Sequence, residues 1–533
     1  MKVYLARGII LFLALSVHAQ VSVLTSRNDN SRDGLNPNET TLTTSNVNVT
    51  QFGKLFSQKV NGYVYAQPLY VPNVTIAGTI HNVVYVATEH DSVYAFDADS
   101  NTGTNASPLW HRSFIFPKKG ITTVSDQEQG CDDIYPEIGI TSTPVIDSTS
   151  GTLYLAAKTD DNGTFTWRLH ALDITTGKER PNSPRIIKAK VKGTGAGAVN
   201  GVIAFDPLQE GQRPGLLLQN GTVFIGFASY CDHNPYHGWL LGYDASTMKQ
   251  TAVWNSTRDG KRGGIWQSGT GLAGDGTSIF LATGNGTFDA NIAGKHDYGD
   301  SVTRLVTQQT KAVKVADYFT PYNQGELSSD DRDVGSGGVL LLPDQGQQAP
   351  HEFLAIAVGK EGSIYLIDRD KMGHFHAKNN NQIVQDMENA IGSMFATAGW
   401  WNNNVYFGGS SDYLRQYTFD PTTGLLSTSA VSESPGVFGY PGPTPSISAN
   451  GTSDAIVWAV QRDGHSNDVP ETLHAYDATN LATELYNTDQ NNTRDNPGDA
   501  VKYATPTVVN GKVYVGAIGQ LSVYGLLNDR QRK

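Results

Sequence analysis

The sequence predicts an all-β protein assembled from eight copies of one strand-rich unit. Eight times, a short apolar strand is followed by a second strand and, after a polar turn, by a third strand that ends near an aspartate. Aromatic and β-branched residues dominate these strands, and Asp-Gly, Asn-Gly and Thr-Gly pairs mark the turns. Four antiparallel strands in a unit of about 50 to 75 residues are typical of a β-propeller blade, so we expect an eight-bladed β-propeller.

The first strand of each unit is the most regular element of the repeat. These strands are predicted at 67–71, 143–147, 215–219, 270–274, 338–342, 398–402, 444–448 and 505–509. The second and third strands are clearest where the turn between them is short, at 83–99, 354–370, 405–420 and 513–527. A fourth, outer strand is predicted at 108–114, 251–257 and 483–489. The units therefore have the four-stranded pattern of a blade.

The two ends of the repeat are expected to meet in one blade. The first strand candidate, 54–60, precedes the first complete unit and has the pattern of an outer strand. It would pair with the last unit, which starts at Ala504, because a closed ring leaves no long open sheet edge. The blades would then span about 54 to 528, and the polar residues 20–50 are expected to be a lead-in.

The N-terminus has the three parts of a secretory signal peptide. Lys2 and Arg7 precede the apolar run 8–17, and a Val-His-Ala cleavage site precedes Gln20. The run of about ten residues is too short to cross a hydrocarbon layer of roughly 30 Å. We expect residues 1–19 to be removed and residues 20–533 to form a single secreted propeller domain.

Asn-x-Ser/Thr sequons support an address in the secretory pathway. Candidate glycosylation sites are Asn38, Asn48, Asn73, Asn105, Asn162, Asn220, Asn255, Asn285, Asn450 and Asn491. Such triplets also arise by chance in a chain rich in Asn and Thr, so only some of them are expected to carry glycans.

Charge and composition exclude several kinds of partner. The formal net charge is -12 and the chain has no Lys/Arg run, whereas nucleic-acid binding needs a basic face. No stretch after the leader reaches transmembrane length, so no membrane partner is expected. A small-molecule substrate is the remaining expectation, and the sequence does not determine the oligomeric state.

Cys131 and Cys231 are the two cysteines of the chain. In an oxidising compartment an even pair most simply forms one disulfide. The alternative is that the two cysteines bind a metal as thiolates, but they do not have the Cys-x-x-Cys spacing that is typical of such sites. A disulfide that closes so long a loop would contribute on the order of 4 to 5 kcal/mol in the chain-entropy model.

The turns of the repeat resemble those of a known superfamily. LHALDITTG (169–177), YTFDPTTG (417–424) and LHAYDAT (473–479) are similar to elements of the quinoprotein alcohol dehydrogenase-like (PQQ-like) eight-bladed propellers. The resemblance implies pyrroloquinoline quinone (PQQ) on a tryptophan, a vicinal Cys-Cys ring, and calcium held by Glu, Asn and Asp. No two cysteines adjoin here, so we expect no cofactor and no metal, with PQQ and calcium as the alternative.

Two connections between inner strands carry the candidate site. Cys131 and Glu137 lie in 130–143, and 221–244 contains Cys231, Asp232 and His237. If the cysteines are joined, both connections meet at one rim and Glu137 lies near His237, as proton transfer would require. We therefore predict this pair to be catalytic, although Asp and His in turns more often cap backbone donors.

Further substrate-binding candidates lie on turns that would face the central funnel. They are Asp232, His233, Tyr236, Trp266, Gln267, Glu89, His90, Lys360 and Arg462. Each of the charged residues in a hairpin turn could instead be a solvated turn residue, and Trp266 could wedge between blades. His233 and His237 have the spacing of a metal pair, but that spacing aligns ligands on a helix and this segment is not helical.

Three functions are consistent with these features. The chain is similar to secreted fungal enzymes of natural-product pathways, the hetero-Diels–Alderases that join tropolone-type quinone methides to terpene alkenes. This resemblance implies dehydration followed by cycloaddition without a cofactor, and it is the function we expect. The alternatives are a PQQ-dependent alcohol or sugar dehydrogenase and a propeller that binds a ligand or protein without catalysis.

Overall fold

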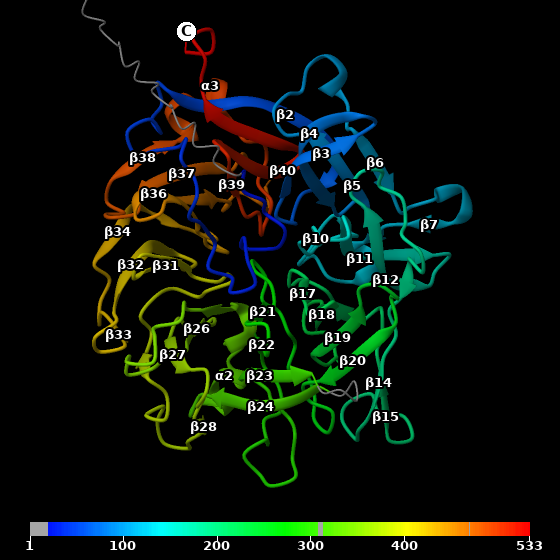
Figure 1. Ribbon diagram of the computed structural model, residues 1–533. Coiled ribbons are helices and arrows are strands. Elements are labelled where there is room, and N and C mark those ends of the chain that lie inside the picture. Colours follow the sequence, from blue (N-terminus) through cyan, green and yellow to red (C-terminus); the bar gives the residue numbers. More distant parts are fainter. Residues whose placement is uncertain (1–19, 308–312, 468, 533) are drawn as a thin grey trace, which may run out of the picture.

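A computed structural model describes residues 20–307, 313–467 and 469–532, so the predicted signal peptide lies outside the described residues. Within the described residues, eight mainly antiparallel sheets stand around one axis (Figure 1). The prediction of an eight-bladed β-propeller is confirmed. Each predicted first strand forms the first strand of a blade.

Blades 1 to 4 follow one another in sequence. Blade 1 contains β3 (Leu69–Ile76), β4 (Thr79–Thr88), β5 (Ser92–Asp97) and β6 (Trp110–Ser113). Blade 2 contains β10 (Val145–Asp147), β11 (Thr152–Asp161), β12 (Phe165–Asp173) and β13 (Arg185–Ile186), with β7 (Ile121–Thr122) on β11. Blade 3 contains β17 (Leu217–Gln219), β18 (Thr222–Ser229), β19 (Trp239–Asp244) and β20 (Gln250–Asn255), with β16 (Glu210–Gly211) on β18. Blade 4 contains β21 (Ala273–Gly274), β22 (Ile279–Ala282), β23 (Val302–Thr307), β24 (Val313–Thr320) and β28 (His374–Phe375).

Blades 5 to 8 complete the ring. Blade 5 contains β25 (Val339–Leu341), β26 (Leu354–Val358), β27 (Ile364–Asp368) and β29 (Gln385–Met387). Blade 6 contains β30 (Gly399–Trp401), β31 (Asn404–Gly408), β32 (Asp412–Asp420), β33 (Leu425–Leu426) and β34 (Ser432–Phe438). Blade 7 contains β35 (Ser446–Asn450), β36 (Ser453–Gln461), β37 (Thr472–Asp477) and β38 (Glu484–Asn487), with β1 (Leu35–Asn36) on β35. Blade 8 contains β39 (Thr507–Val509), β40 (Lys512–Leu526) and β2 (Phe52–Tyr63).

Short elements fill the connections between blades. Two further ribbons are β8 (Val124–Ser125) with β9 (Glu137–Ile138), and β14 (Lys190–Lys192) with β15 (Val202–Ala204). The helices are α1 (Asp126–Gln129), α2 (Gln324–Ser329) and α3 (Asn492–Asp495), with single 3₁₀ turns at Gly103–Ala106, Pro117–Lys119, Val334–Ser336 and Thr488–Asn491. In the part of the chain that the structure describes, no helix has the length and apolar character needed to cross a membrane.

The predicted closure of the ring is confirmed. β2 pairs antiparallel with the second part of β40, with Phe52 opposite Leu526 and Lys59 opposite Gln520. The first part of β40 pairs with β39. Both ends of the described chain therefore contribute to blade 8, where the blue β2 lies beside the red β40 (Figure 1).

Aromatic pairs join neighbouring blades. Trp167 of β12 meets Phe227 of β18 edge-on, with ring centroids 5.7 Å apart. Phe319 of β24 lies 5.1 Å from Tyr365 of β27. Each such pair adds about 0.5 to 1.5 kcal/mol beyond the burial of apolar area. The core is thus distributed over the interfaces between blades, and the axis is left for polar groups.

The expectation that residues 20–50 are only a lead-in is wrong. Residues 21–39, here called the axial segment, descend into the centre of the ring (Figure 1). The axial segment hydrogen-bonds to the first strand of every blade. The bonded pairs, in order of blade, are Val23 with Tyr70, Leu24 with Ile146, Asn30 with both Leu218 and Gly274, Ser31 with Leu341, Asp33 with Trp400, Gly34 with Ile447, and Asn36 with Val508. The first strands would otherwise present unpaired backbone groups to the axis, and such groups are costly when buried.

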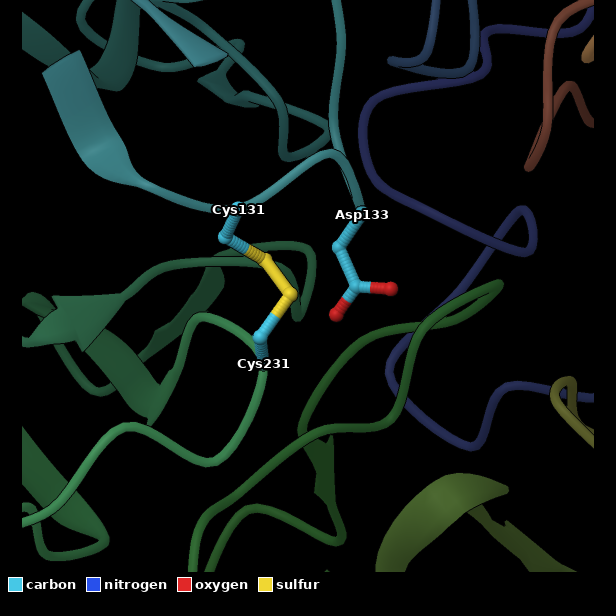
Figure 2. A group of neighbouring side chains, drawn as sticks. All are labelled: Cys131, Asp133 and Cys231. Atoms are coloured by element: carbon cyan, nitrogen blue, oxygen red, sulfur yellow. A yellow bond between two sulfur atoms is a disulfide. The ribbon is translucent and has the colours of Figure 1, made fainter. Parts of the chain in front are cut away.

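The predicted disulfide between Cys131 and Cys231 is confirmed (Figure 2). It joins the connection between blades 1 and 2 to the turn between β18 and β19 of blade 3, across a sequence separation of 100. Metal-binding thiolates are thereby excluded for these two residues, because both sulfurs are bonded to each other.

Replacing both cysteines with alanine is expected to lower the free energy of unfolding by about 4 kcal/mol, because a loop of this length gains much entropy when it opens in the unfolded chain. Urea unfolding followed by tryptophan fluorescence measures the change. Wild-type protein that is reduced and alkylated serves as the control and should show the same loss. An unchanged midpoint in both samples would contradict the expectation.

Two of the predicted glycosylation sites are wrong for the folded chain. The side chains of Asn255 and Asn285 are 5% and 0% exposed, so neither has room for a glycan. Asn38, Asn73, Asn162, Asn220 and Asn450 are exposed, and Asn48, Asn105 and Asn491 are half-buried, so these sequons stay predictions. Asn255 is the last residue of β20, and Asn285 follows β22 in blade 4.

Candidate functional site

A cavity of about 480 Å³ opens where the connections between blades converge. Its lining residues are Asp133, Arg213, Cys231, Asp232, Trp266, Ser268, Asp331, Asp333, Ser336, Lys360, Phe395, Tyr440 and Tyr503. We call it the funnel pocket. A narrower space continues from it towards the axis and reaches Ser26, so the axial segment closes the floor. The volume lies in the range of small-molecule sites.

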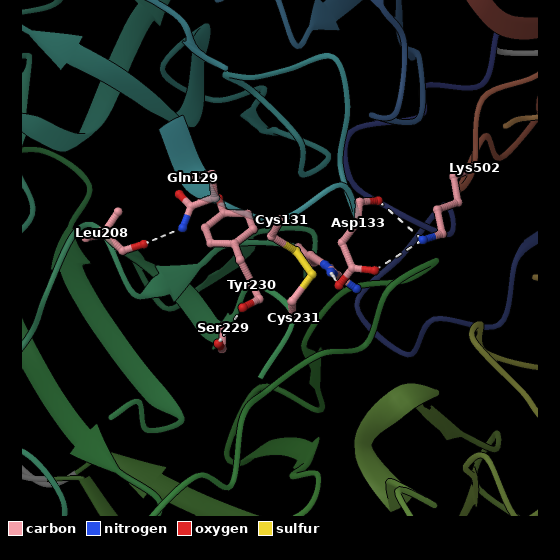
Figure 3. Close-up of a disulfide and its surroundings, with 9 residues drawn as sticks. Gln129, Cys131, Asp133, Leu208, Ser229, Tyr230, Cys231 and Lys502 are labelled. Carbon is pink, nitrogen blue, oxygen red and sulfur yellow. Dashed lines mark hydrogen bonds and ion pairs between the residues drawn. A yellow bond between two sulfur atoms is a disulfide. The ribbon is translucent and has the colours of Figure 1, made fainter. Parts of the chain in front are cut away.

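One wall of the funnel pocket is a charged cluster around Asp133. The Arg213 guanidinium donates to Asp133 at 2.7 Å, and the Lys502 ammonium lies 3.3 Å from the same carboxylate (Figure 3). Burial raises the pKa of Asp133, but Arg213 and Lys502 outweigh it and hold that pKa well below its usual range. The carboxylate is therefore ionised, and the cluster carries one net positive charge.

Two tyrosines lie against these cations. The Lys502 ammonium is 5.2 Å from the ring centre of Tyr440 and 5.6 Å from that of Tyr503. Burial raises the pKa of Tyr503, but Lys502 and Arg213 lower it by more, so its pKa lies below that of an ordinary tyrosine. Burial together with the neighbouring Tyr503 raises the pKa of Tyr440 to about 12. Both phenols lie against the Lys502 ammonium, and the Arg213 guanidinium also lies 5.8 Å from the centre of the Tyr503 ring, so Tyr503 has two cations beside it.

A second ionic group occupies the opposite side. The Lys360 ammonium lies 2.6 Å from Asp333 and 3.0 Å from Asp331. Burial raises the pKa of Asp333, and Lys360 opposes that rise. Lys360 comes from the turn between β26 and β27, whereas Asp333 precedes the 3₁₀ turn Val334–Ser336. Charges from different blades therefore face one cavity.

Aromatic side chains complete the wall. Trp266 is buried, and the Arg213 guanidinium stacks 4.9 Å from the centre of its ring. The indole N–H of Trp266 is buried without a hydrogen-bond partner in the described residues. Phe395 lies 5.2 Å from Tyr440, in an edge-on contact at the rim. A ligand in the funnel pocket would therefore meet flat aromatic surfaces.

Several residues that the sequence singled out lie in the funnel pocket. Asp232, Trp266 and Lys360 line it, and so does Cys231 of the disulfide. The Asp232 carboxylate also accepts a hydrogen bond from the hydroxyl of Tyr236, which is buried behind the wall and packs against Trp266. The prediction that the disulfide marks the site's rim agrees with this geometry.

The predicted pairing of Glu137 with His237 is wrong. Glu137 lies in β9, which folds back on β8, and its carboxylate is 3.0 Å from His90 and accepts from Thr123. His237 precedes β19, and its ring nitrogens lie 2.8 Å from the Thr257 hydroxyl and 2.9 Å from the Ala196 carbonyl. The disulfide brings the two connections together, but neither Glu137 nor His237 lines the funnel pocket.

Other predicted substrate-binding residues have structural contacts. Glu89 is buried and accepts from the Gly139 amide and the Thr141 hydroxyl. Gln267 bonds to the backbone of Gly271 and Ala282. Arg462 donates to the backbone of Gly442 and to the hydroxyl of Thr444. His90 pairs with Glu137 and His233 is exposed, and neither lines the funnel pocket.

Three of the four carboxylates that line the funnel pocket are paired with cations, which disfavours a calcium site, and the fourth, Asp232, accepts from the Tyr236 hydroxyl. Calcium takes six to eight oxygen ligands, usually including carboxylates without a competing cation. Asp333 and Asp331 are held by Lys360, and Asp133 is held by Arg213 and Lys502. In the described residues, the one cluster with metal-ligand types is Cys131, Asp133 and Cys231, and its sulfurs form the disulfide (Figure 2).

Comparisons with known proteins support the fold. No protein-family model and no curated protein matches the chain. The chain is similar to the crystal structure of quinohemoprotein alcohol dehydrogenase from Comamonas testosteroni, with a TM-score of 0.57 and 14% identity over 95% of this chain and 80% of that chain. The corresponding enzyme ADHIIG from Pseudomonas putida HK5 gives the same values. A europium-containing methanol dehydrogenase matches with a TM-score of 0.58 and 12% identity, over 95% of this chain and 98% of that chain.

Fold and pocket define the chain as an eight-bladed β-propeller with a polar, aromatic funnel pocket. At 12 to 14% identity, the likeness to these dehydrogenases is a likeness of fold. The resemblance to hetero-Diels–Alderases stays a prediction.

Proposed function

We propose that the protein is a secreted, cofactor-independent enzyme that dehydrates a hydroxylated tropolone or phenol and adds the product to a terpene alkene. The observation that carries the proposal is the position of Tyr503, a buried phenol beside the cations Arg213 and Lys502 in an aromatic pocket. These groups match the needs of a substrate that loses water and passes through an oxygen anion. In this proposal, residues of the funnel pocket carry out the proton transfer that the sequence analysis assigned to Glu137 and His237.

The first step is loss of water. Tyr503 donates its proton to the departing hydroxyl group as the carbon–oxygen bond breaks, and it recovers a proton from the ring hydroxyl of the substrate. Arg213 and Lys502 stabilise negative charge on that ring oxygen while it forms. Water leaves and a neutral quinone methide remains, so no oxidant or reductant is consumed.

The second step is cycloaddition. The quinone methide is a four-atom heterodiene, and its addition to the alkene forms one carbon–carbon and one carbon–oxygen bond with no atom lost. Trp266, Phe395 and Tyr440 provide flat surfaces that would hold both partners in one orientation. Holding two reactants in a reactive geometry is worth several kcal/mol of the barrier.

The test uses a hydroxymethyl-substituted tropolone and a cyclic sesquiterpene alkene with the purified full chain. Product formation is followed by chiral chromatography, because the uncatalysed addition gives both enantiomers equally. We expect faster adduct formation with one enantiomer in excess. A racemic product formed at the rate without protein would overturn the proposal. Substrate binding without any rate increase would identify a binding propeller instead.

A PQQ-dependent oxidoreductase of the alcohol or sugar dehydrogenase type is the second candidate. It is favoured by one observation, that the disulfide and a tryptophan with an unused indole N–H face the same pocket. The cations on its carboxylates weigh against the calcium that such enzymes use. Titration of the protein with PQQ and calcium, followed by dye reduction with alcohols, separates this candidate from the first.

A further inference from the structure

A second cavity, of about 230 Å³, lies between blades 1 and 2, away from the funnel pocket. It is lined by Arg112, Phe114, Phe116, Ile121, Thr159, Arg168, His170, Glu179 and Pro184. Four of these nine side chains are apolar, and two arginines, a histidine–glutamate pair and a threonine supply the polar groups. None of these residues belongs to the funnel pocket.

His170, on β12, is the buried polar group of this cavity. Its ring is 4% exposed, and Nδ1 lies 2.7 Å from the Glu179 carboxylate. Nδ1 therefore carries the proton that bonds Glu179, and Nε2 is left as an acceptor. Nε2 is buried without a partner in the described residues, and so is Nε of Arg112. Buried polar atoms of this kind normally have a partner.

Blade 7 carries the same motif with a glutamine side chain beside Nε2. His474 follows the same Leu-His-Ala pattern on β37, and its Nδ1 lies 2.6 Å from Glu484. There, Nε2 lies 3.3 Å from the side-chain oxygen of Gln461. His474 is opposite Ala459 and His170 is opposite Leu155, so Gln461 corresponds in register to Ala157. Alanine cannot reach the ring, which leaves the blade 2 histidine open to a ligand.

We propose that the blade 2 cavity binds a small hydroxylated aromatic carboxylate. The ligand's hydroxyl would donate to Nε2 of His170, and its carboxylate would accept from Arg112, whose guanidinium also lies 3.8 Å from the Glu179 carboxylate. The ring would lie between Phe114, Phe116 and Pro184. A volume of 230 Å³ is below the usual range for drug-sized ligands, which limits the ligand to a single ring.

Isothermal titration calorimetry on the full chain tests the proposal with 3- and 4-hydroxybenzoate, benzoate and 4-hydroxybenzyl alcohol. We expect at least one hydroxybenzoate to bind, and benzoate to bind at least tenfold more weakly because it cannot donate to Nε2. The alcohol should also bind at least tenfold more weakly, since it lacks the carboxylate. Failure of both hydroxybenzoates to bind at millimolar concentration, or equal binding of benzoate, overturns the proposal.

The decisive variant is Ala157→Gln, which copies the blade 7 arrangement into blade 2. In the folded variant it should weaken hydroxybenzoate binding at least tenfold while leaving the stereoselectivity at the funnel pocket unchanged. The matched control is Gln461→Ala in blade 7, which should leave the affinity unchanged. Undiminished binding to folded Ala157→Gln places the ligand elsewhere and overturns the proposal. If that variant does not fold, the comparison of benzoate with hydroxybenzoate on the wild type still decides.

Discussion

Tyr503→Phe is expected to lower the turnover of the dehydration and cycloaddition by about a thousandfold, within the range that a positioned proton donor contributes. The substitution removes one hydroxyl and keeps the ring that packs in the funnel pocket, so substrate affinity should change little. Single-turnover rates with the tropolone substrate measure the loss. The effect should fall on kcat, because the proton is needed when the carbon–oxygen bond breaks.

Tyr440→Phe is the matched control for this variant. Tyr440 lies against the same lysine, whereas Tyr503 lies against both this lysine and Arg213. We expect its replacement to cost less than tenfold. Glu137→Gln and His237→Asn should each leave the rate within about threefold, because a group without contact to the reacting atoms contributes little. Equal losses in the two tyrosine variants would remove Tyr503 from its role.

The sequence predicted the blades well because strand periodicity and turn residues are local signals. The same repeat also indicates the site, through the residue type at one repeated position. Two residues before each predicted first strand, the chain places Tyr65, Thr141, Arg213, Ser268, Ser336, Ala396, Gly442 and Tyr503. Six of these line the funnel pocket or the space below it. A charged or aromatic residue at this repeated position, as at Arg213 and Tyr503, indicates the site.

The catalytic pair could not be predicted from the cysteines alone. A disulfide fixes the separation of two backbone positions, but Glu137 lies six residues beyond Cys131 and its direction is set by the β8–β9 ribbon. His237 is likewise turned by its own backbone towards Thr257. Side-chain direction depends on these tertiary contacts, which leave no pattern in the sequence.

The axial segment escaped prediction for a related reason. Its sequence is polar and lacks strand periodicity, which usually indicates a loop at the surface. Its contacts are instead with backbone groups of eight strands that are far away in the sequence. Arg27 and Arg32 are fully buried there, and their guanidinium groups donate to carbonyl oxygens of the inner strands. Arginine suits this position because its several donors can serve more than one blade.

Deleting residues 20–39 is expected to abolish folding, because the inner edges of all eight blades would lose their partners at once. A buried donor or acceptor left unpaired costs about 1 to 3 kcal/mol, so the summed loss exceeds the net stability of a typical domain. Expression behind an intact leader, with the yield of folded protein measured by gel filtration and circular dichroism, tests this. A monodisperse, β-rich deletion variant would show that the axial segment is dispensable.

Arg32→Met probes the same contacts within a complete chain. Arg32 is 0% exposed and donates to the carbonyls of Leu272, Leu216 and Ser26 at 2.8, 3.2 and 2.6 Å. Methionine fills similar volume but donates nothing, so we expect a loss of about 3 kcal/mol in the free energy of unfolding. Arg530→Met, in the exposed tail, should change it by less than about 0.5 kcal/mol. If urea unfolding gave both variants the wild-type midpoint, the axial contacts would add nothing to stability, and the polar axis would need another explanation.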